Sequence, residues 1–231
     1  MTLDAEWVGG LESAPVKNPI ITLDGPAGAG KSTVARTVAR DLGFRFLDTG
    51  AMYRAFTWKA LETGLDLRDE KALVASIRAS RLEMEGGRVV LDGRDISADI
   101  RSERITRNSV YLADPPAVRA ELVKHQQAIG RAGGLVTEGR DQGTIVFPDA
   151  EFKFYLDASV EVRARRRVDE LVARGEKADY PDILTGIADR DERDRRRPVG
   201  ALRKPAGAIE IDTSHLTIDD VVKRVISIVR G

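Results

Sequence analysis

The sequence predicts an α/β protein whose mostly parallel sheet is covered by helices on both faces. Short apolar runs alternate with segments of helical periodicity along most of the chain, which is the pattern that βαβ units produce. The glycine-rich octapeptide 25–32 joins the first apolar run to the first helical segment. Segment 64–104 differs, because short alternating strands around Gly86-Gly87 and Asp92-Gly93 predict a small antiparallel β insertion.

The elements follow from local signals taken in chain order. Strands are expected at 20–24, 44–48, 135–138, 152–156 and 208–212, where short apolar runs end at turn-forming residues. Helices are expected at 31–42, 51–62, after Pro115-Pro116, at 159–174 and from near Thr217. In the last helix, Ile218, Val222, Val225 and Val229 form the expected buried stripe. We therefore expect a single domain over 18–231, with an insertion near 64–104, a helical lid near 158–198 and a flexible extension at 1–17.

The composition is that of a soluble globular protein and excludes several functional classes. Basic and acidic residues number 37 each, so no net charge attracts nucleic acid or membrane. The chain has no cysteine, which excludes disulfides, thiolate zinc sites and thiol nucleophiles. No apolar run approaches the roughly 20 residues of a membrane span, and the first residues lack a signal-peptide pattern. We expect a cytoplasmic protein, monomeric by default, that binds neither nucleic acid nor membrane.

The segment 25–32 matches the phosphate-binding pattern G-x-x-x-x-G-K-[ST] in full. Its backbone N–H groups and the positive end of the following helix can cradle an anion. Lys31 can reach the β- and γ-phosphates of ATP, and the Ser32 hydroxyl can bind Mg²⁺. The expected ATP-binding residues are Gly25, Pro26, Ala27, Gly28, Ala29, Gly30, Lys31, Ser32 and Thr33. The sequence thus predicts a P-loop NTPase, and the absence of an N-K-x-D guanine reader argues against a switch GTPase.

Two further segments, 48–54 and 138–144, follow predicted strands and point to the phosphate acceptor. Ligands collect at the carboxyl ends of strands in open α/β sheets, which would bring Arg54 and Arg140 to the crevice beside the P-loop. A guanidinium can bind a phosphate in a bidentate manner. Further arginines that could stabilise a moving phosphate are Arg163, Arg166, Arg167, Arg190 and Arg197. Interleaved acidic residues leave open the alternative that these arginines belong to solvated helix faces.

At these motifs the chain resembles the bacterial cytidylate kinases, which are nucleoside monophosphate kinases. The similarity rests on GPAGAGKS, LDTGAMYR, the hairpin insertion, EGRDQGTIVFPDA, YLDAS with its arginine helix, and RDERDRRR. The resemblance implies transfer of the ATP γ-phosphate to CMP or dCMP with Mg²⁺. It implies catalytic roles for Lys31, Arg163, Arg166, Arg167 and Arg190. It implies acceptor-binding roles for Thr49, Tyr53, Arg54, Arg119, Arg140, Asp141, Arg190, Asp194 and Arg197.

The chemistry of the acceptor fits that resemblance. An aspartate that only accepts and an arginine that only donates match the N4 amino group and the O2/N3 acceptors of cytosine. The nucleophile, a phosphate oxygen, is largely ionised at pH 7, so no dedicated base is needed. Asp24 and Asp48 are therefore expected in structural or metal-shell roles. Two positions depart from the family pattern, with Val110 in place of a serine and Glu138 in place of an aspartate.

Two other functions remain open from the sequence. One is a P-loop kinase for another acceptor, either UMP or a hydroxyl metabolite such as shikimate. An alcohol acceptor calls for an aspartate base, and the paired phosphate arginines argue against it. The other is a nucleotide-binding regulator without transferase activity, against which the arginine-rich lid argues.

Overall fold

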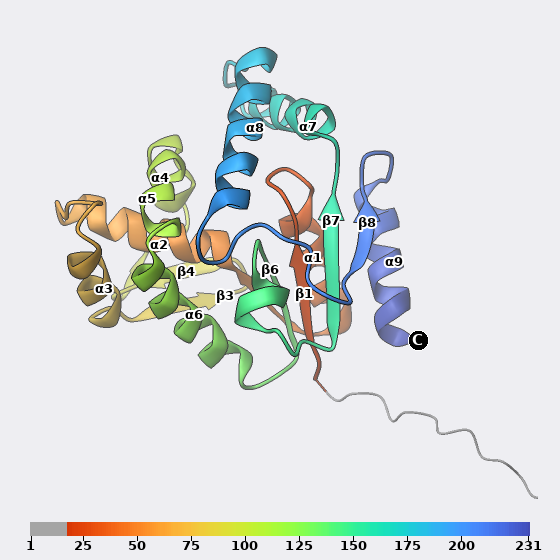
Figure 1. The fold of residues 1–231 in the computed structure, drawn as a ribbon, viewed down its shortest axis with the longest axis horizontal. Helices are drawn as coiled ribbons and strands as arrows, with labels where there is room; N and C mark the ends of the chain where they lie inside the picture. Colours follow the sequence, from red (N-terminus) through yellow and green to blue (C-terminus); the bar gives the residue numbers. More distant parts are fainter. Residues whose placement is uncertain (1–17) are drawn as a thin grey trace, which may run out of the picture.

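A parallel five-stranded sheet in the order β2-β6-β1-β7-β8 forms the centre of the fold (Figure 1). The computed structural model describes residues 18–231, and the extension expected at 1–17 lies outside the described residues. The strands are β1 (Ile20–Asp24), β2 (Arg45–Asp48), β6 (Leu135–Gly139), β7 (Phe152–Asp157) and β8 (Ile209–Asp212). The five runs expected as strands therefore all join one sheet, and the predicted α/β fold class is confirmed.

Each face of the sheet is covered by its own set of helices. Ile21 and Leu23 of β1 are fully buried against one face, where helices α1 (Lys31–Leu42) and α9 (Ile218–Arg230) pack. Helices α2 (Thr49–Glu62) and α6 (Pro116–Gly130) cover the other face. Because strand residues alternate between faces, Thr22 and Asp24 point to the α6 side, away from α1.

Two helix predictions need correction. Helix α2 begins at Thr49 rather than 51, because the Asp48 carboxylate accepts the Ala51 N–H at 2.7 Å and caps the helix. The buried stripe of α9 does not include Ile218, which is 37% exposed. Val221, which was not expected in the stripe, is buried. Ile218 is the first residue of α9 and lies beside Gly30 of the P-loop, so it borders the nucleotide-sized cavity described below.

The insertion contains the expected antiparallel sheet and also a helix that the hairpin pattern did not predict. The sheet consists of β3 (Leu82–Glu85), β4 (Arg88–Leu91) and β5 (Arg94–Asp95). Before it lies α3 (Glu70–Arg78), which buries Leu73 and Ile77. The short helices η1 (Asp99–Arg101), α4 (Glu103–Asn108) and α5 (Val110–Ala113) lead from this sheet to α6.

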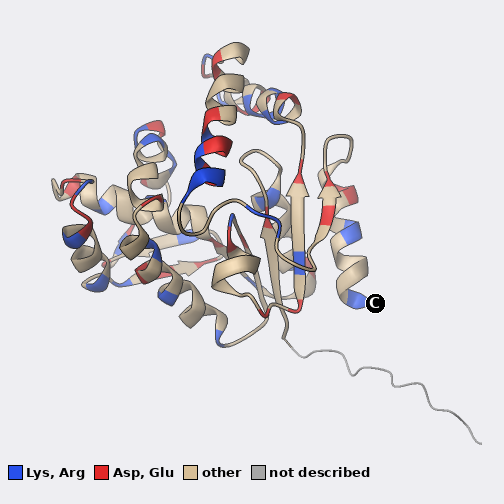
Figure 2. Ribbon diagram, in the orientation of Figure 1, with Lys and Arg blue, Asp and Glu red and all other residues tan. Residues whose placement is uncertain are grey.

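Helices α7 (Val160–Ala173) and α8 (Tyr180–Arg196) pack against each other above the carboxyl ends of β1 and β7 (Figure 1). They occupy the segment expected as a helical lid. Their basic and acidic residues are interleaved (Figure 2). Among residues 18–231, no helix has the length and apolar character needed to cross a membrane.

Candidate active site

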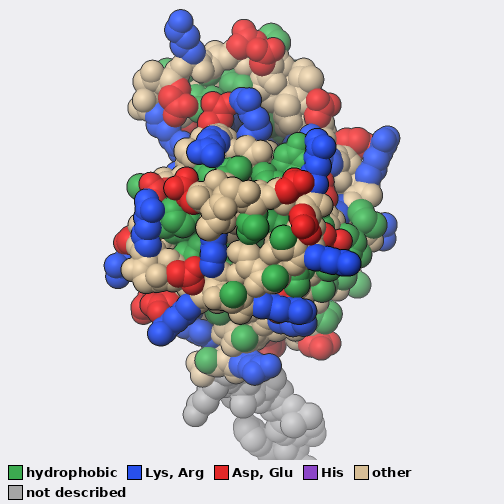
Figure 3. Space-filling model, turned by 90° about the vertical axis from the view of Figure 1, so that its left-hand side faces the viewer, with side chains coloured by type: hydrophobic (Ala, Val, Ile, Leu, Met, Phe, Trp, Pro, Cys, Tyr) green, Lys and Arg blue, Asp and Glu red, His purple; other side chains and the backbone are tan. Residues whose placement is uncertain are grey.

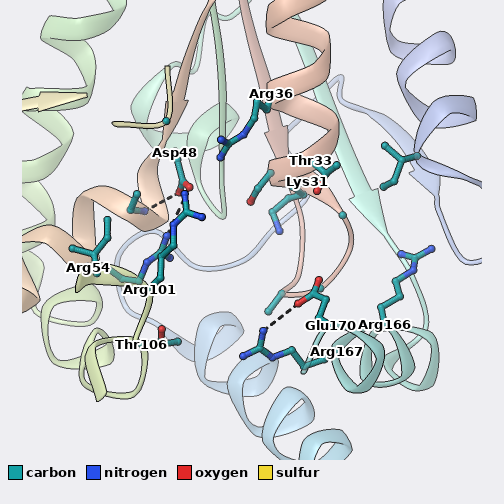
Figure 4. Close-up of a pocket in the computed structure, with 18 of the residues that line it drawn as sticks. Lys31, Thr33, Arg36, Asp48, Arg54, Arg101, Thr106, Arg166, Arg167 and Glu170 are labelled. Atoms are coloured by element: carbon teal, nitrogen blue, oxygen red, sulfur yellow. Dashed lines mark hydrogen bonds and ion pairs between the residues drawn. The ribbon is translucent and has the colours of Figure 1, made fainter. Parts of the chain in front are cut away.

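A cavity of about 1000 Å³ lies at the carboxyl ends of the strands. The P-loop and the first turns of α1 form one wall, and Figure 4 shows Asp48, Arg54 and Arg101 facing them from the insertion side. Helices α7 and α8 close the cavity with Arg166, Arg167 and Arg190. Cationic side chains thus enter the cavity from three separate parts of the fold.

The P-loop adopts a backbone that only glycine allows at its first position. Gly25 has φ 146°, and a Cβ there would collide with the backbone carbonyl oxygen of Leu156. Lys31 is 4% exposed, and its Nζ donates a hydrogen bond to the Pro26 carbonyl at 2.7 Å. Burial, together with the charge of the nearby Arg140, lowers the pKa of Lys31 to about 7. The charges of Glu138 and Asp24 act in the opposite direction, and an anion in the loop would add to them.

We predict that replacing Lys31 with methionine changes the pH dependence of stability. The unfolded chain keeps this ammonium protonated up to about pH 10.5, whereas the folded chain releases the proton above about pH 7. The buried charge of Lys31 lowers the free energy of unfolding. Because the unfolded state binds more protons in this interval, that free energy rises again as the pH increases from about 7 to about 10.

Thermal unfolding of both proteins across this pH range measures the effect. The Tm advantage of Lys31→Met over the wild type should be largest near pH 7 and should shrink toward pH 10. Parallel Tm curves would contradict the assigned environment of Lys31.

Two carboxylates, those of Glu138 and Asp48, lie close to each other near the P-loop. Ser32 Oγ donates to Glu138 Oε1 at 2.8 Å, so the longer side chain at this departure from the family pattern reaches the P-loop directly. Thr49 Oγ1 donates to the Glu138 carbonyl at 2.7 Å. Burial raises the pKa of Asp48, and the charge of Glu138 adds to that rise. Arg54 lies 3.7 Å from Asp48 and opposes it.

Arg140, Asp194 and Arg197 form a second, buried group. The Arg140 Nε lies 2.9 Å from Asp194 Oδ2, and the Arg197 Nη2 lies 2.6 Å from Asp194 Oδ1. Burial would raise the pKa of Asp194, but the two arginines hold it below its usual range. Beside them, burial and the charge of Arg140 lower the pKa of Arg190 to about 10. The structure therefore brings four predicted residues together, but only Arg190 among them lines the cavity.

Arg119 and Asp141 form an ion pair with less than a twentieth of either residue exposed. The Arg119 guanidinium carbon lies 5.6 Å from the centre of the Tyr53 ring. The Tyr53 hydroxyl and the Arg119 Nε are buried and have no hydrogen-bond partner within residues 18–231. Buried polar atoms are nearly always paired, so these two are candidates for ligand contact. Sequence reasoning placed all three residues in the acceptor site, and the structure brings them into contact with one another.

We predict that Gly200→Ala disrupts this ion pair. A Cβ at Gly200 would collide with both the Arg119 guanidinium and the Asp141 carboxylate. The variant should raise the KM for the acceptor nucleotide about tenfold or more, because it displaces a buried charged pair.

The matched control is Gly207→Ala. Gly207 also has a positive φ of 72°, but a Cβ there meets nothing within 4 Å. Both variants therefore carry the backbone strain of an alanine at positive φ, and only Gly200→Ala should change the KM. Equal KM values for the two variants would contradict the prediction.

Arg163 does not reach the cavity, unlike the other arginines predicted on its helix. Its Nε donates to the Ala158 carbonyl at 2.9 Å, and its Nη1 donates to the Ala27 carbonyl of the P-loop at 3.0 Å. The same Nη1 lies 2.6 Å from Asp191 of α8. Arg166 and Arg167 line the cavity, where Arg167 pairs with Glu170 at 3.1 Å (Figure 4). Arg163 thus joins the P-loop to both helices.

Several cavity residues were missed from the sequence. Arg36 of α1 lines the wall with its guanidinium carbon 5.2 Å from the centre of the Phe46 ring, and it touches the hairpin turn at Gly87. Arg101 and Thr106 come from the short helices after the hairpin. Of these three residues, only Arg36 could have been predicted from the sequence, because it lies on the helix that begins at the P-loop lysine. The others depend on how the insertion folds back.

A complete P-loop at the sheet edge, facing arginines from an insertion and two helices, defines a P-loop kinase. The family model described as cytidylate kinase matches residues 21–231. The chain belongs to the cytidylate kinase family, as the sequence resemblance predicted.

Similar proteins agree with this assignment. The cytidylate kinase of Rhodopirellula baltica is 48% identical over 211 residues, which cover 91% of this chain and 92% of that protein. The cytidylate kinase of Caldanaerobacter subterraneus subsp. tengcongensis is 48% identical over 210 residues, covering 91% and 94%. An uncharacterised protein from Eubacterium ventriosum shares the fold, with a TM-score of 0.51, 11% identity, and 93% and 99% of the two chains covered.

Proposed function

We propose that this protein transfers the γ-phosphoryl group of ATP to CMP or dCMP, giving CDP or dCDP. The observation that carries the proposal is the buried Arg119–Asp141 pair, which lies at the same sheet edge as a complete P-loop. Membership of the cytidylate kinase family supports the same reaction. The P-loop backbone binds the triphosphate, and the Lys31 ammonium stabilises the negative charge of the transferred phosphoryl group.

The acceptor phosphate is bound by Arg54, Arg140 and Arg197 in this proposal, with Arg190 and Asp194 beside the ribose. The depressed pKa of Arg190 supports it, because arginines that lie close together favour an anion between them. Asp194 already neutralises part of this charge through its contacts with Arg140 and Arg197. The acceptor phosphate must therefore share these guanidinium groups with Asp194.

The cytosine is recognised by Arg119 and Asp141, with Tyr53 and Thr49 nearby. Asp141 accepts from the N4 amino group, and the free Arg119 Nε donates toward the O2/N3 edge. Uracil would present a carbonyl to the aspartate and leave a buried acceptor unpaired. This mismatch costs on the order of 1–3 kcal/mol, about ten- to a hundredfold in kcat/KM. Val110 contributes no hydrogen bond to this recognition.

The residues present fit an oxygen-liganded cation such as Mg²⁺. Ser32, Glu138 and Asp48 supply a hydroxyl and two carboxylates, which are the donors that hard cations prefer. Within residues 18–231 no cluster of three or more acidic or imidazole side chains is placed to hold a metal, so the ATP phosphates would complete the shell. The ion would neutralise phosphate charge, with Ser32 as its protein ligand and Glu138 orienting that hydroxyl.

The chain itself positions the two nucleotides and stabilises the transferred group. The acceptor phosphate has a second pKa near 6, so its oxygen attacks without a protein base at neutral pH. Lys31, Arg166, Arg167 and Arg190 supply positive charge around the transferred phosphoryl group. Arg163 does not contact the phosphoryl group in this proposal but holds the P-loop against α7 and α8.

A coupled ADP-release assay with CMP, dCMP, UMP, AMP and shikimate tests the proposal. ADP release should depend on CMP or dCMP and on Mg²⁺. Turnover with shikimate alone would favour the hydroxyl-kinase alternative, and no turnover with any acceptor would favour the nucleotide-binding regulator.

We also propose a monomer that works in the cytoplasm, where ATP and CMP are available. Basic and acidic side chains are mixed over the face in Figure 3, which supports a monomer rather than a charged interface. Size-exclusion chromatography with light scattering measures the oligomeric state directly.

A further inference from the structure

We propose that Asp24 is a positioning residue that holds the loop of Arg140 and Asp141 in register with the P-loop. Neither the family match nor the cavity points to this residue. The inference rests on the proposed function only in naming CMP as the ligand of that loop. The anchoring itself is independent of which nucleotide binds.

The Asp24 carboxylate uses both of its oxygens on the acceptor loop. Asp24 is the last residue of β1 and has no exposed surface. Its Oδ1 accepts the Gln142 N–H at 2.8 Å, and its Oδ2 accepts the Gly143 N–H at 2.7 Å. These amides directly follow Arg140 and Asp141 in the chain. The carboxylate therefore fixes the backbone on which the two acceptor residues are carried.

A buried polar network supports the loop from below. Thr137 Oγ1 donates to the Gln142 side chain at 2.9 Å, and Gln142 Nε2 donates to Gln126 Oε1 at 3.0 Å. Next to them, a Cβ at Gly143 would lie 2.9 Å from Thr22 Oγ1 and from Pro205. The loop is thus held on β1, β6 and α6 at once and has little room to shift.

The position of Asp24 in the chain links the two halves of the site. Gly25, the first residue of the P-loop, follows it directly. Asp24 therefore ends the strand that leads into the P-loop, and its side chain also anchors the loop of Arg140 and Asp141. The two loops cannot move independently at this point. Register between them matters because phosphoryl transfer needs both nucleotides in line.

Asp24 is held in an environment that favours its neutral form. Burial raises the pKa of Asp24 to about 7, although the Gly143 and Gln142 amides and Lys31 oppose this and Asp141 adds to it. A buried carboxylate contributes little to stability compared with an apolar side chain, so its presence here points to a positional role. A role as catalytic base does not fit, because both oxygens already accept backbone hydrogen bonds and Asp24 does not line the cavity.

Asp24→Asn tests the proposal with little change in side-chain volume. An asparagine presents an NH₂ group to one of the two N–H donors, so at least one loop amide loses its acceptor. The KM for CMP should rise about tenfold or more, while the KM for ATP stays within about twofold. Hydrogen exchange of the Gln142 and Gly143 amides should become faster, with the amides of the sheet strands unchanged.

Asp212→Asn is the matched control. Asp212 ends β8 of the same sheet, and its exposed carboxylate accepts the nearby Ser214 N–H. This variant should leave both KM values and the exchange of the Gln142 and Gly143 amides unchanged. The proposal is overturned if Asp24→Asn leaves the KM for CMP unchanged or raises both KM values equally.

A second variant keeps the proposal testable if Asp24→Asn does not fold. Gly143→Ala leaves the carboxylate intact but pushes the Gly143 amide away through the contacts with Thr22 and Pro205. It should also raise the KM for CMP selectively, and an unchanged KM would overturn the proposal. Failure of the proposed function is recognised separately, because the wild type would then not turn over CMP while the two loop amides would still respond to Asp24→Asn.

Discussion

Replacing Lys31 with alanine is expected to lower kcat for CMP phosphorylation by about a thousandfold or more. Lys31 is the cationic side chain inside the P-loop, and its Nζ donates a hydrogen bond to the Pro26 carbonyl. Its Nζ is bonded to a carbonyl oxygen rather than to a carboxylate, so its charge is available to the phosphates of ATP. Without it, negative charge on the transferred group loses its nearest protein counter-charge.

The loss should be in turnover rather than in folding. Burial disfavours the charged form of Lys31, as its lowered pKa shows, so removal of the ammonium should not lower the Tm near pH 7. Steady-state kinetics with CMP, together with thermal unfolding, separates the two effects. Lys223→Ala, on the exposed side of α9, is the control and should retain wild-type kcat. Turnover retained by Lys31→Ala would remove the P-loop from the mechanism.

Replacing Arg140 with alanine is expected to raise the KM for CMP about a hundredfold, with ATP binding nearly unchanged. Arg140 is partly buried and shares Asp194 with Arg197. The variant removes one phosphate ligand and leaves the negative charge of Asp194 opposed by fewer cations. That charge then repels the acceptor phosphate, so two effects act in the same direction.

Kinetics over a CMP series and direct titration with an ATP analogue measure the two halves of the site. Arg196→Ala is the control, because Arg196 lies at the end of α8 with a side chain 79% exposed and pairs only with Glu192. It should behave as the wild type. A tenfold loss of ATP affinity in Arg140→Ala would contradict its assignment to the acceptor half.

Elements with local signals were predictable from the sequence, and those that depend on tertiary contacts were not. The P-loop lies between an apolar strand and an amphipathic helix, so its place at the sheet edge followed from sequence. Helix α3 was missed although Leu73 and Ile77 lie four residues apart on one buried face, because the glycine turns later in the same segment favoured strands throughout. Ile218 is exposed because it is the first residue of α9 and lines the cavity, which no local pattern records.

The same distinction holds for the site. Arg119 and Asp141 were placed together by their family motifs, and their contact confirms that they are neighbours. Arg163 shows the opposite case, because its sequence context is the same arginine run as that of Arg166 and Arg167. Contacts with Ala158, Ala27 and Asp191 hold its side chain away from the cavity, and two of these partners are distant in the sequence. Residue type and spacing can identify a cationic helix but not which of its cations a ligand meets.

The three contacts of Arg163 have a thermodynamic consequence. One guanidinium is bonded to the P-loop at Ala27 and paired with α8 at Asp191. The position of α8 and the conformation of the P-loop are therefore energetically coupled. Any arrangement of α8 that favours ATP must be favoured by ATP in equal measure, because linkage between two equilibria is reciprocal. The donor nucleotide and the helix above it therefore act on each other as two ligands of one protein do.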